Sequence, residues 1–174
     1  RGGKLLWMVD AVHAEMDSLS GKGEMITYPK RELNLDDFLF KYGVRINTNL
    51  IKDIQCAAIP MNTSMQNGQP QWTMHPWYYF PVILPEKEHS ITNNLNTVKL
   101  EFTSTIDPIK SPGIKKTPLL KSSVYTSVKS TPSRILLQEA IDKPKEDQYK
   151  AGQKVVSYLL EGKFTSYFKN KTSK

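Results

Sequence analysis

Apolar residues follow the period of a helix most clearly in residues 34–43, NLDDFLFKYG. The apolar side chains spaced i, i+3, i+4 and i+7, which share one helix face, are Leu35, Phe38, Leu39 and Tyr42. We expect Asn34 to be the N-cap and Gly43 the left-handed C-cap of this helix. Asp36 and Asp37 then lie in the first turn, where the helix dipole favours anions. A second, shorter helix or turn is predicted within residues 11–20.

Most of the remaining pattern is typical of strands. Residues 4–9, KLLWMV, are almost uninterruptedly apolar and predict a strand buried on both faces of a sheet. The other predicted strands lie in VRIN (44–47), NLIKDIQCAAIPM (49–61), WYYFPVIL (77–84), residues 98–102, GIKKTPLLKSSVYTS (113–127) and RILLQEA (134–140), and KVVSYLLEGKFTSYF (154–168) is predicted to form a terminal strand pair. We therefore expect an α/β fold with a mixed, strand-rich sheet and few helices.

Length and composition indicate one folded unit. A chain of 174 residues that is 39% hydrophobic and 24% charged is typical of a single globular domain, and we expect residues 170–174 to form a disordered tail. No apolar run reaches the roughly 18 residues of a membrane span. Because the chain begins RGGKLLWMVD, without Met or a signal peptide, we interpret residues 1–174 as an interior piece of a longer protein.

The net charge of +7 is unevenly distributed. Residues 1–87 carry nine Lys/Arg and nine Asp/Glu, whereas residues 88–174 carry fifteen and eight. The basic residues are scattered singly and most are lysines, whereas nucleic-acid sites favour clustered arginine with aromatic platforms. We therefore expect a solvated positive surface and no nucleic-acid partner.

The GK pair in LLEGKFTSYF resembles the end of a phosphate-binding loop, G-x-x-x-x-G-K-[ST]. Ser157 stands where the first glycine is needed, and Phe164 stands where the hydroxyl that binds Mg²⁺ is needed. We therefore predict that this segment is strand and turn, that it binds no nucleotide, and that the chain needs no cofactor.

Catalytic and metal-binding patterns are weak. Cys56 lies between Gln55 and Ala57, without the glycines of a nucleophile elbow, and is interpreted as a buried thiol. The histidines His13, His75 and His89 are isolated, so no metal site is predicted. Asp10 is either a ligand-binding carboxylate at the end of a strand or the cap of the helix or turn that follows.

An aromatic cluster is the best candidate for a small-ligand or partner site. Its members, which combine rings for stacking with a polar histidine, are Trp72, His75, Trp77, Tyr78 and Tyr79. The alternative is that these rings pack in the core or in a lid. Three functions therefore remain open from the residues: a binding or scaffold domain, a sugar- or peptide-binding module, and a degenerate hydrolase that uses Asp10, His13 or Cys56.

Several long segments, taken in order, resemble the gliding-motility ABC-transporter auxiliary protein family of Bacteroidetes, usually called GldG. They are GGKLLWMVD, LNLDDFLFKYGVRIN, WYYFPVI, ITNNLNTVKLEFTSTID, GIKKTPLLKSS and LLEGKFTSYFKN. The resemblance covers nearly all of the chain. It implies a non-catalytic auxiliary domain on the periplasmic side of the inner membrane, held there by segments outside this chain.

The resemblance also implies partners and a fold. The partners are an ABC permease, a separate ATPase subunit and proteins of the motility machinery. The fold would be similar to the GIFT domain of intraflagellar-transport proteins and to the class I glutamine-amidotransferase-like fold. That ancestry would supply a cysteine nucleophile, but Cys56 lacks the required context, so we expect no enzymatic activity.

Overall fold

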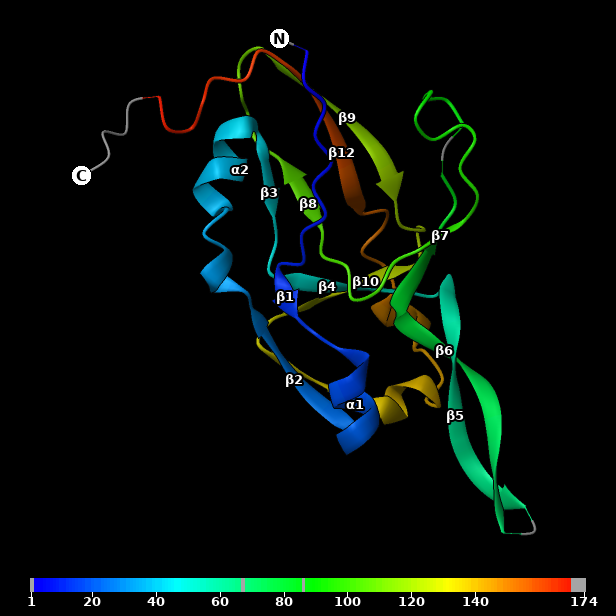
Figure 1. Ribbon diagram of the computed structural model, residues 1–174. Coiled ribbons are helices and arrows are strands. Elements are labelled where there is room, and N and C mark those ends of the chain that lie inside the picture. The colour runs from blue at the N-terminus through cyan, green and yellow to red at the C-terminus, as the bar shows by residue number, and fades with distance from the viewer. Residues whose placement is uncertain (1, 67, 86, 170–174) are drawn as a thin grey trace.

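The computed structural model describes residues 2–66, 68–85 and 87–169 (Figure 1). The strands are β1 (Val12–His13), β2 (Glu24–Pro29), β3 (Val44–Ile46), β4 (Asn49–Asp53), β5 (Cys56–Gln66), β6 (Gln69–Ile83), β7 (Val98–Lys99), β8 (Ile106–Pro108), β9 (Ile114–Lys121), β10 (Thr126–Ser130), β11 (Ser133–Leu136) and β12 (Val155–Gly162). The helices are α1 (Met16–Lys22), α2 (Asp36–Tyr42) and the short 3₁₀ helices η1 (Arg31–Leu33), η2 (Leu137–Ala140) and η3 (Glu146–Gln148).

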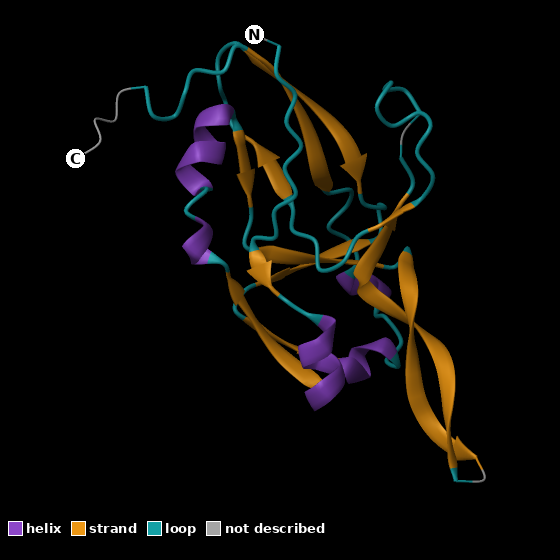
Figure 2. Ribbon diagram, viewed as in Figure 1, coloured by secondary structure: helices purple, strands orange, loops and turns teal. Residues whose placement is uncertain are grey.

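The predicted strand-rich α/β architecture with few helices is confirmed (Figure 2). The strands form several small sheets instead of one large one. Their orders in the described residues are β1–β2–β11, β5–β6–β7, β4–β10, β9–β12 and β3–β8, and each of these pairings is antiparallel.

The core lies where the β1–β2–β11 sheet and α1 meet β4, η2 and the base of the β5–β6 hairpin. Its buried side chains are Val12, Leu19, Met25, Leu50, Ile59, Met61, Trp77, Tyr79, Phe80, Phe102, Ile135 and Ala140. The hairpin then runs beyond the core, and Figure 1 shows its far end projecting away from the other elements. We call residues 60–74 the arm.

The prediction of a buried strand at residues 4–9 is wrong. Leu5 and Met8 are 85% and 87% exposed, and the segment is extended chain without sheet pairing. Trp7 instead packs against Phe38 of α2, with ring centroids 5.4 Å apart. A continuous apolar run carries no information about its partner, and here the partner is a helix surface.

The predicted helix forms, with a later start. Its N-cap is Leu35, so the assignment of Asn34 as N-cap is wrong. Asn34 adopts left-handed angles at the end of η1, and its side-chain amide donates to the Glu32 carbonyl, a local bond that suits a short polar side chain. Gly43 is the left-handed C-cap as predicted, and its N–H donates to the carbonyls of Leu39 and Phe40.

The predicted terminal strand pair is a single strand. β12 ends at Gly162 and pairs with β9, whereas the residues that follow pack against α2. Tyr42 meets the ring of Phe164 at 5.2 Å, and Phe38 meets that of Tyr167 at 5.9 Å. These aromatic contacts hold the segment against the helix, so it does not form the second strand of the predicted pair.

Other predicted strands are shortened or divided. Residues 49–61 divide into β4 and β5 because the Asp53 carboxylate accepts the backbone N–H of Gln55 and turns the chain. The alternation at 98–102 ends after Lys99, and Phe102 has a left-handed φ of 47°. The predicted tail, residues 170–174, lies outside the described residues.

Candidate functional site

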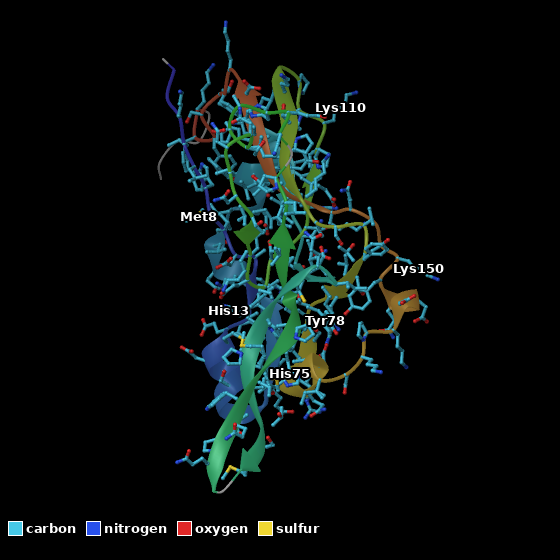
Figure 3. The ribbon with its side chains drawn as sticks, turned by 90° about the vertical axis from the view of Figure 1, so that its right-hand side faces the viewer. Met8, His13, His75, Tyr78, Lys110 and Lys150 are labelled. Atoms are coloured by element: carbon cyan, nitrogen blue, oxygen red, sulfur yellow. The ribbon has the colours of Figure 1, made fainter. Side chains whose placement is uncertain are left out.

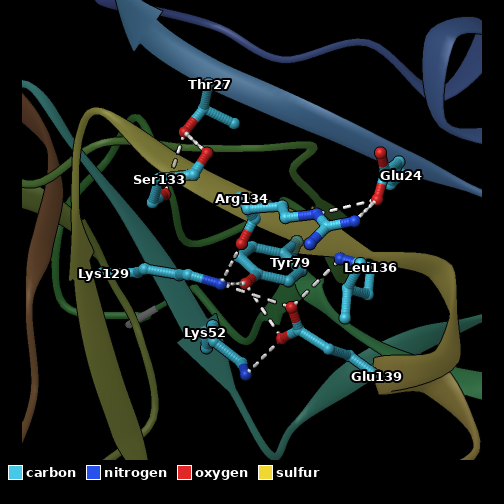
Figure 4. A network of polar contacts seen from close by, with 9 residues as sticks. All are labelled: Glu24, Thr27, Lys52, Tyr79, Lys129, Ser133, Arg134, Leu136 and Glu139. Atoms are coloured by element: carbon cyan, nitrogen blue, oxygen red, sulfur yellow. Dashed lines mark hydrogen bonds and ion pairs between the residues drawn. The ribbon is translucent and has the colours of Figure 1, made fainter.

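A network of polar contacts surrounds Glu139 of η2 (Figure 4). Lys52 of β4 donates to Glu139 Oε2 at 2.8 Å, and Lys129 of β10 lies 3.3 Å from Oε1. The hydroxyl of Tyr79, on β6, donates to Oε2 at 3.0 Å, and the N–H of Leu136 donates to Oε1 at 3.2 Å. One carboxylate on η2 thus contacts β4, β6, β10 and β11, and of these β4 and β6 are far from η2 in the sequence.

The electrostatics of this cluster favour a fixed charge on Glu139. Burial raises the pKa of Glu139, but the hydrogen bond and charge of Lys52, with the charge of Lys129, outweigh it and hold the pKa below its ordinary value. Burial, and then the neighbouring Glu139 charge, raise the pKa of Tyr79, so its hydroxyl stays protonated and acts as a donor.

The cluster is closed by aromatic rings. The ammonium of Lys52 lies 5.2 Å from the centroid of Tyr79, and 6.0 Å from those of Tyr78 and Tyr149. Lys129 also donates to the carbonyl of Arg134 at 2.7 Å. Because each charged group is engaged by protein partners, the cluster is suited to clamping β4, β6, β10 and η2 together, and it offers no nucleophile with an adjacent base.

A groove lies where β4, β8, β10 and β12 meet, with an open volume of about 520 Å³. The residues that line it are Asn47, Asn49, Thr105, Ile106, Asp107, Pro108, Val128, Ala151, Gln153, Lys154, Val155 and Tyr158. Asn47 donates through Nδ2 to Asp107 Oδ2 and to Thr105 Oγ1, both at 2.8 Å. The Asn47 hydrogen bond, with that of Arg45, lowers the pKa of Asp107 despite partial burial. The groove therefore combines apolar and polar side chains, with an ionised carboxylate on its wall.

The predicted aromatic cluster divides between the core and the arm. Trp77, Tyr78 and Tyr79 are buried, and in this structure their rings pack inside the protein. Trp72 is 66% exposed on the arm, and His75 is half-buried, with its ring nitrogen 2.8 Å from the Thr73 hydroxyl. Figure 3 shows His75 and Tyr78 along the same strand, β6. Trp72 and His75 are therefore more exposed to solvent than the three buried rings.

The residues considered for a hydrolase have different partners. Asp10 is exposed and lies 3.9 Å from Lys30, and it does not cap α1, whose N-cap is Glu15. His13 pairs with Glu32 at 2.7 Å. Cys56 is half-buried at the start of β5, and burial, then the charge of Asp53, raise its pKa to about 11, which disfavours the reactive thiolate.

Gly162, the glycine of the GK pair, has a structural role at the end of β12. It pairs with Ile114 of β9, and a Cβ atom at this position would lie 2.3 Å from the carbonyl oxygen of Gly113. The glycine therefore permits close approach of two backbones. This confirms the prediction of strand and turn at Gly162.

The polar contacts around Glu139 and those between Asn47 and Asp107 were not predicted from the sequence. Glu139 and Lys52 are 87 residues apart, and Asn47 and Asp107 are 60 apart. Single charged or amide residues within strand patterns carry no signal of such pairing. Lys110 and Lys150, two of the scattered basic residues, are exposed and lie well apart from each other (Figure 3).

Comparison with known proteins assigns the chain to a family. No helix of the described residues is long and apolar enough to cross a membrane, and the described residues contain no group of three or more His, Cys, Asp or Glu that could hold a metal ion. No curated protein and no solved structure matches the chain. A family model described as an ABC-type uncharacterized transport system matches residues 1–174. The chain therefore belongs to this family and is an auxiliary component of an ABC-type transport system.

Proposed function

We propose that this chain is a non-catalytic scaffold domain of an ABC transporter that serves bacterial gliding motility, on the periplasmic side of the inner membrane. Its partners in this proposal are the permease, a separate ATPase subunit and motility proteins. Membership of the transport-system family over residues 1–174 supports the auxiliary role. The link to gliding rests on the resemblance of the sequence to the GldG family.

The non-catalytic role is supported above all by the Glu139 cluster, in which each charged group is paired with other groups of the protein. Its carboxylate is held by Lys52, Lys129 and Tyr79, and its lowered pKa makes it a poor proton carrier near neutral pH. The thiol of Cys56, with a pKa of about 11, is a poor nucleophile. Such groups stabilise a binding domain and supply no catalytic pair.

The test is purification of the tagged full-length protein from its native membranes, with mass spectrometry of what accompanies it. We expect an ABC permease and its ATPase in stoichiometric amounts, and loss of gliding in a deletion strain. Recovery of the protein without any transporter component would contradict the proposal. Mg²⁺–ATP at 1 mM should leave the melting temperature of the isolated chain unchanged.

A second candidate function, recognition of a sugar or peptide, is favoured by the groove beside Asp107. Its volume of about 520 Å³ lies within the range of small-ligand sites, and Asn47, Asp107, Lys154 and Tyr158 supply donors and acceptors. Titration of the ¹⁵N-labelled chain with a panel of disaccharides and tripeptides tests this function. Shifts confined to groove residues and abolished by Asp107→Ala would support it, and the absence of shifts would remove it.

A further inference from the structure

The arm belongs to a stretch of chain without charged residues. None of residues 54–85 is Lys, Arg, Asp or Glu, although these four types make up 24% of the chain. The stretch contains the buried base of the β5–β6 hairpin, where neutrality follows from packing in the core. It also contains the projecting arm, where, among the described residues other than Met61, burial gives no reason for the absence of charge (Figure 1).

The two faces of the arm differ. On one face, Ile59 at the base and Met61 are 6% and 8% exposed and belong to the core. On the other face, cross-strand pairing places Pro60 opposite Met74, Asn62 opposite Trp72 and, after a register shift, Met65 opposite Pro70. We call these six residues the stripe. All six are exposed, and Met65, Trp72 and Met74 are each about two-thirds exposed.

The composition of the stripe is typical of the centre of a protein interface. Tryptophan and methionine are enriched at such centres and charged residues are depleted. A charged partner surface would lose its hydration against the stripe and gain no opposite charge, which is costly. The complementary surface is therefore an uncharged apolar groove rimmed by hydrogen-bonding groups that can pair with Asn62.

The edges of the arm are protected against strand addition. Pro60 on β5 and Pro70 on β6 have no backbone N–H, so each removes one hydrogen-bond donor from its strand. A partner strand would find incomplete hydrogen bonding along either edge. Docking through the stripe face is thus favoured over extension of the hairpin sheet.

Two other occupants fit the stripe less well. A second copy would bring together two chains of net charge +7, and their repulsion opposes association. A lipid bilayer would receive a hairpin end that contains Gln69 and Gln71, with Asn62 on the stripe itself, and the polar amides of these side chains are costly to place in hydrocarbon.

We propose that the stripe docks into an uncharged apolar groove on a different protein component of the transport system, with Trp72 as the anchor. This inference rests on the proposed function, because it requires that the chain works beside other transporter components. It adds which face of the domain makes the contact and what chemistry the partner presents.

The test uses the full-length protein in native membranes, with the photoreactive residue p-benzoylphenylalanine in place of Trp72. The matched control carries the same group in place of Tyr125, a similarly exposed ring outside the arm. After irradiation, mass spectrometry identifies the partner and the linked peptide. We expect the position-72 adduct to join one other transporter component through an uncharged segment, and the position-125 control to give no such adduct.

A second measurement uses Trp72→Glu and Met74→Glu, with Tyr125→Glu as control. Each arm variant should reduce recovery of the partner at least tenfold, with an unchanged melting temperature, and the control should leave recovery unchanged. Equal recovery by all variants, an adduct with a second copy, or an adduct with lipid alone would overturn the inference while the proposed function stands. If the unaltered protein recovers no transporter component, the proposed function and the inference fail together.

Discussion

Burial raises the pKa of the Glu139 carboxylate and ion pairing lowers it, and the effect of ion pairing is the larger one. The side chains of Glu139, Lys52 and Lys129 are 19%, 18% and 27% exposed, so water screens the three charges only partly. Removing one of these charged side chains leaves the others partly desolvated and unpaired. The resulting loss of folding free energy is larger than the net stabilisation that the ion pair provides. The cluster therefore makes stability sensitive to single substitutions.

We predict that Glu139→Gln lowers the free energy of unfolding at pH 7 by about 1–3 kcal/mol, because two lysines lose their charged acceptor. Since the folded pKa of Glu139 is lowered, its contribution is complete above the ordinary glutamate pKa of about 4.3 and is lost as the pH falls through the folded value. Urea unfolding at pH 7, 4 and 3 should show the difference from wild type shrinking below about pH 4.

The control is Glu146→Gln, an exposed glutamate in η3, which should change stability by less than about 0.5 kcal/mol. A Glu139→Gln effect no larger than that of the control, or one that does not depend on pH, would show that the cluster contributes no charge pairing to stability.

At the level of elements, close contacts between backbones decide where glycine is required. β12 and β9 form a sheet of two strands, and Gly162 allows the end of β12 to approach Gly113. Gly23 ends α1 with a φ of 72° but faces open space. Substitutions at Gly162 and Gly23 therefore measure two different losses of stability, one from a steric clash and one from a left-handed backbone conformation.

We predict that Gly162→Ala destabilises the protein by about 2–3 kcal/mol, since the added methyl group meets a carbonyl oxygen that moves only with its strand. Gly23→Ala should cost about 1 kcal/mol, from its left-handed conformation alone. Chemical denaturation of both variants measures the difference. Equal losses would contradict the role given to the β9–β12 contact.

At the level of the whole molecule, the β5–β6 hairpin belongs to two environments. Its base supplies Trp77, Tyr79 and Ile59 to the core, and its far end extends beyond the folded body. Buried contacts are therefore concentrated at the base, and in our proposal the arm makes the contact with another protein. This division makes folding and docking separable by mutation.

We predict that replacing residues 62–72 with an Asn-Gly turn leaves the melting temperature within about 4 °C of wild type, because Met61 and Thr73 remain paired and the core is intact. By contrast, Trp77→Ala should cost about 3–5 kcal/mol because it empties a buried site. Thermal unfolding followed by circular dichroism measures both. If the shortened chain melts more than about 4 °C below wild type, the arm also contributes to folding.

The sequence alone determined the features that depend on neighbours along the chain. The helix face formed by Phe38, Leu39 and Tyr42 and the C-cap at Gly43 follow from contacts within four residues, so helical spacing and a glycine were enough to predict them. The strand-rich class was also predictable, because many short apolar runs separated by turn residues favour strands in any arrangement.

Only the tertiary structure decided what depends on distant partners. It placed residues 4–9 on α2 instead of in a sheet, buried Trp77 while leaving Trp72 exposed on the arm, and joined Glu139 to Lys52. An apolar side chain or a single charge is compatible with many partners. The choice among them is made by the free energy of packing the whole chain, which no local pattern contains.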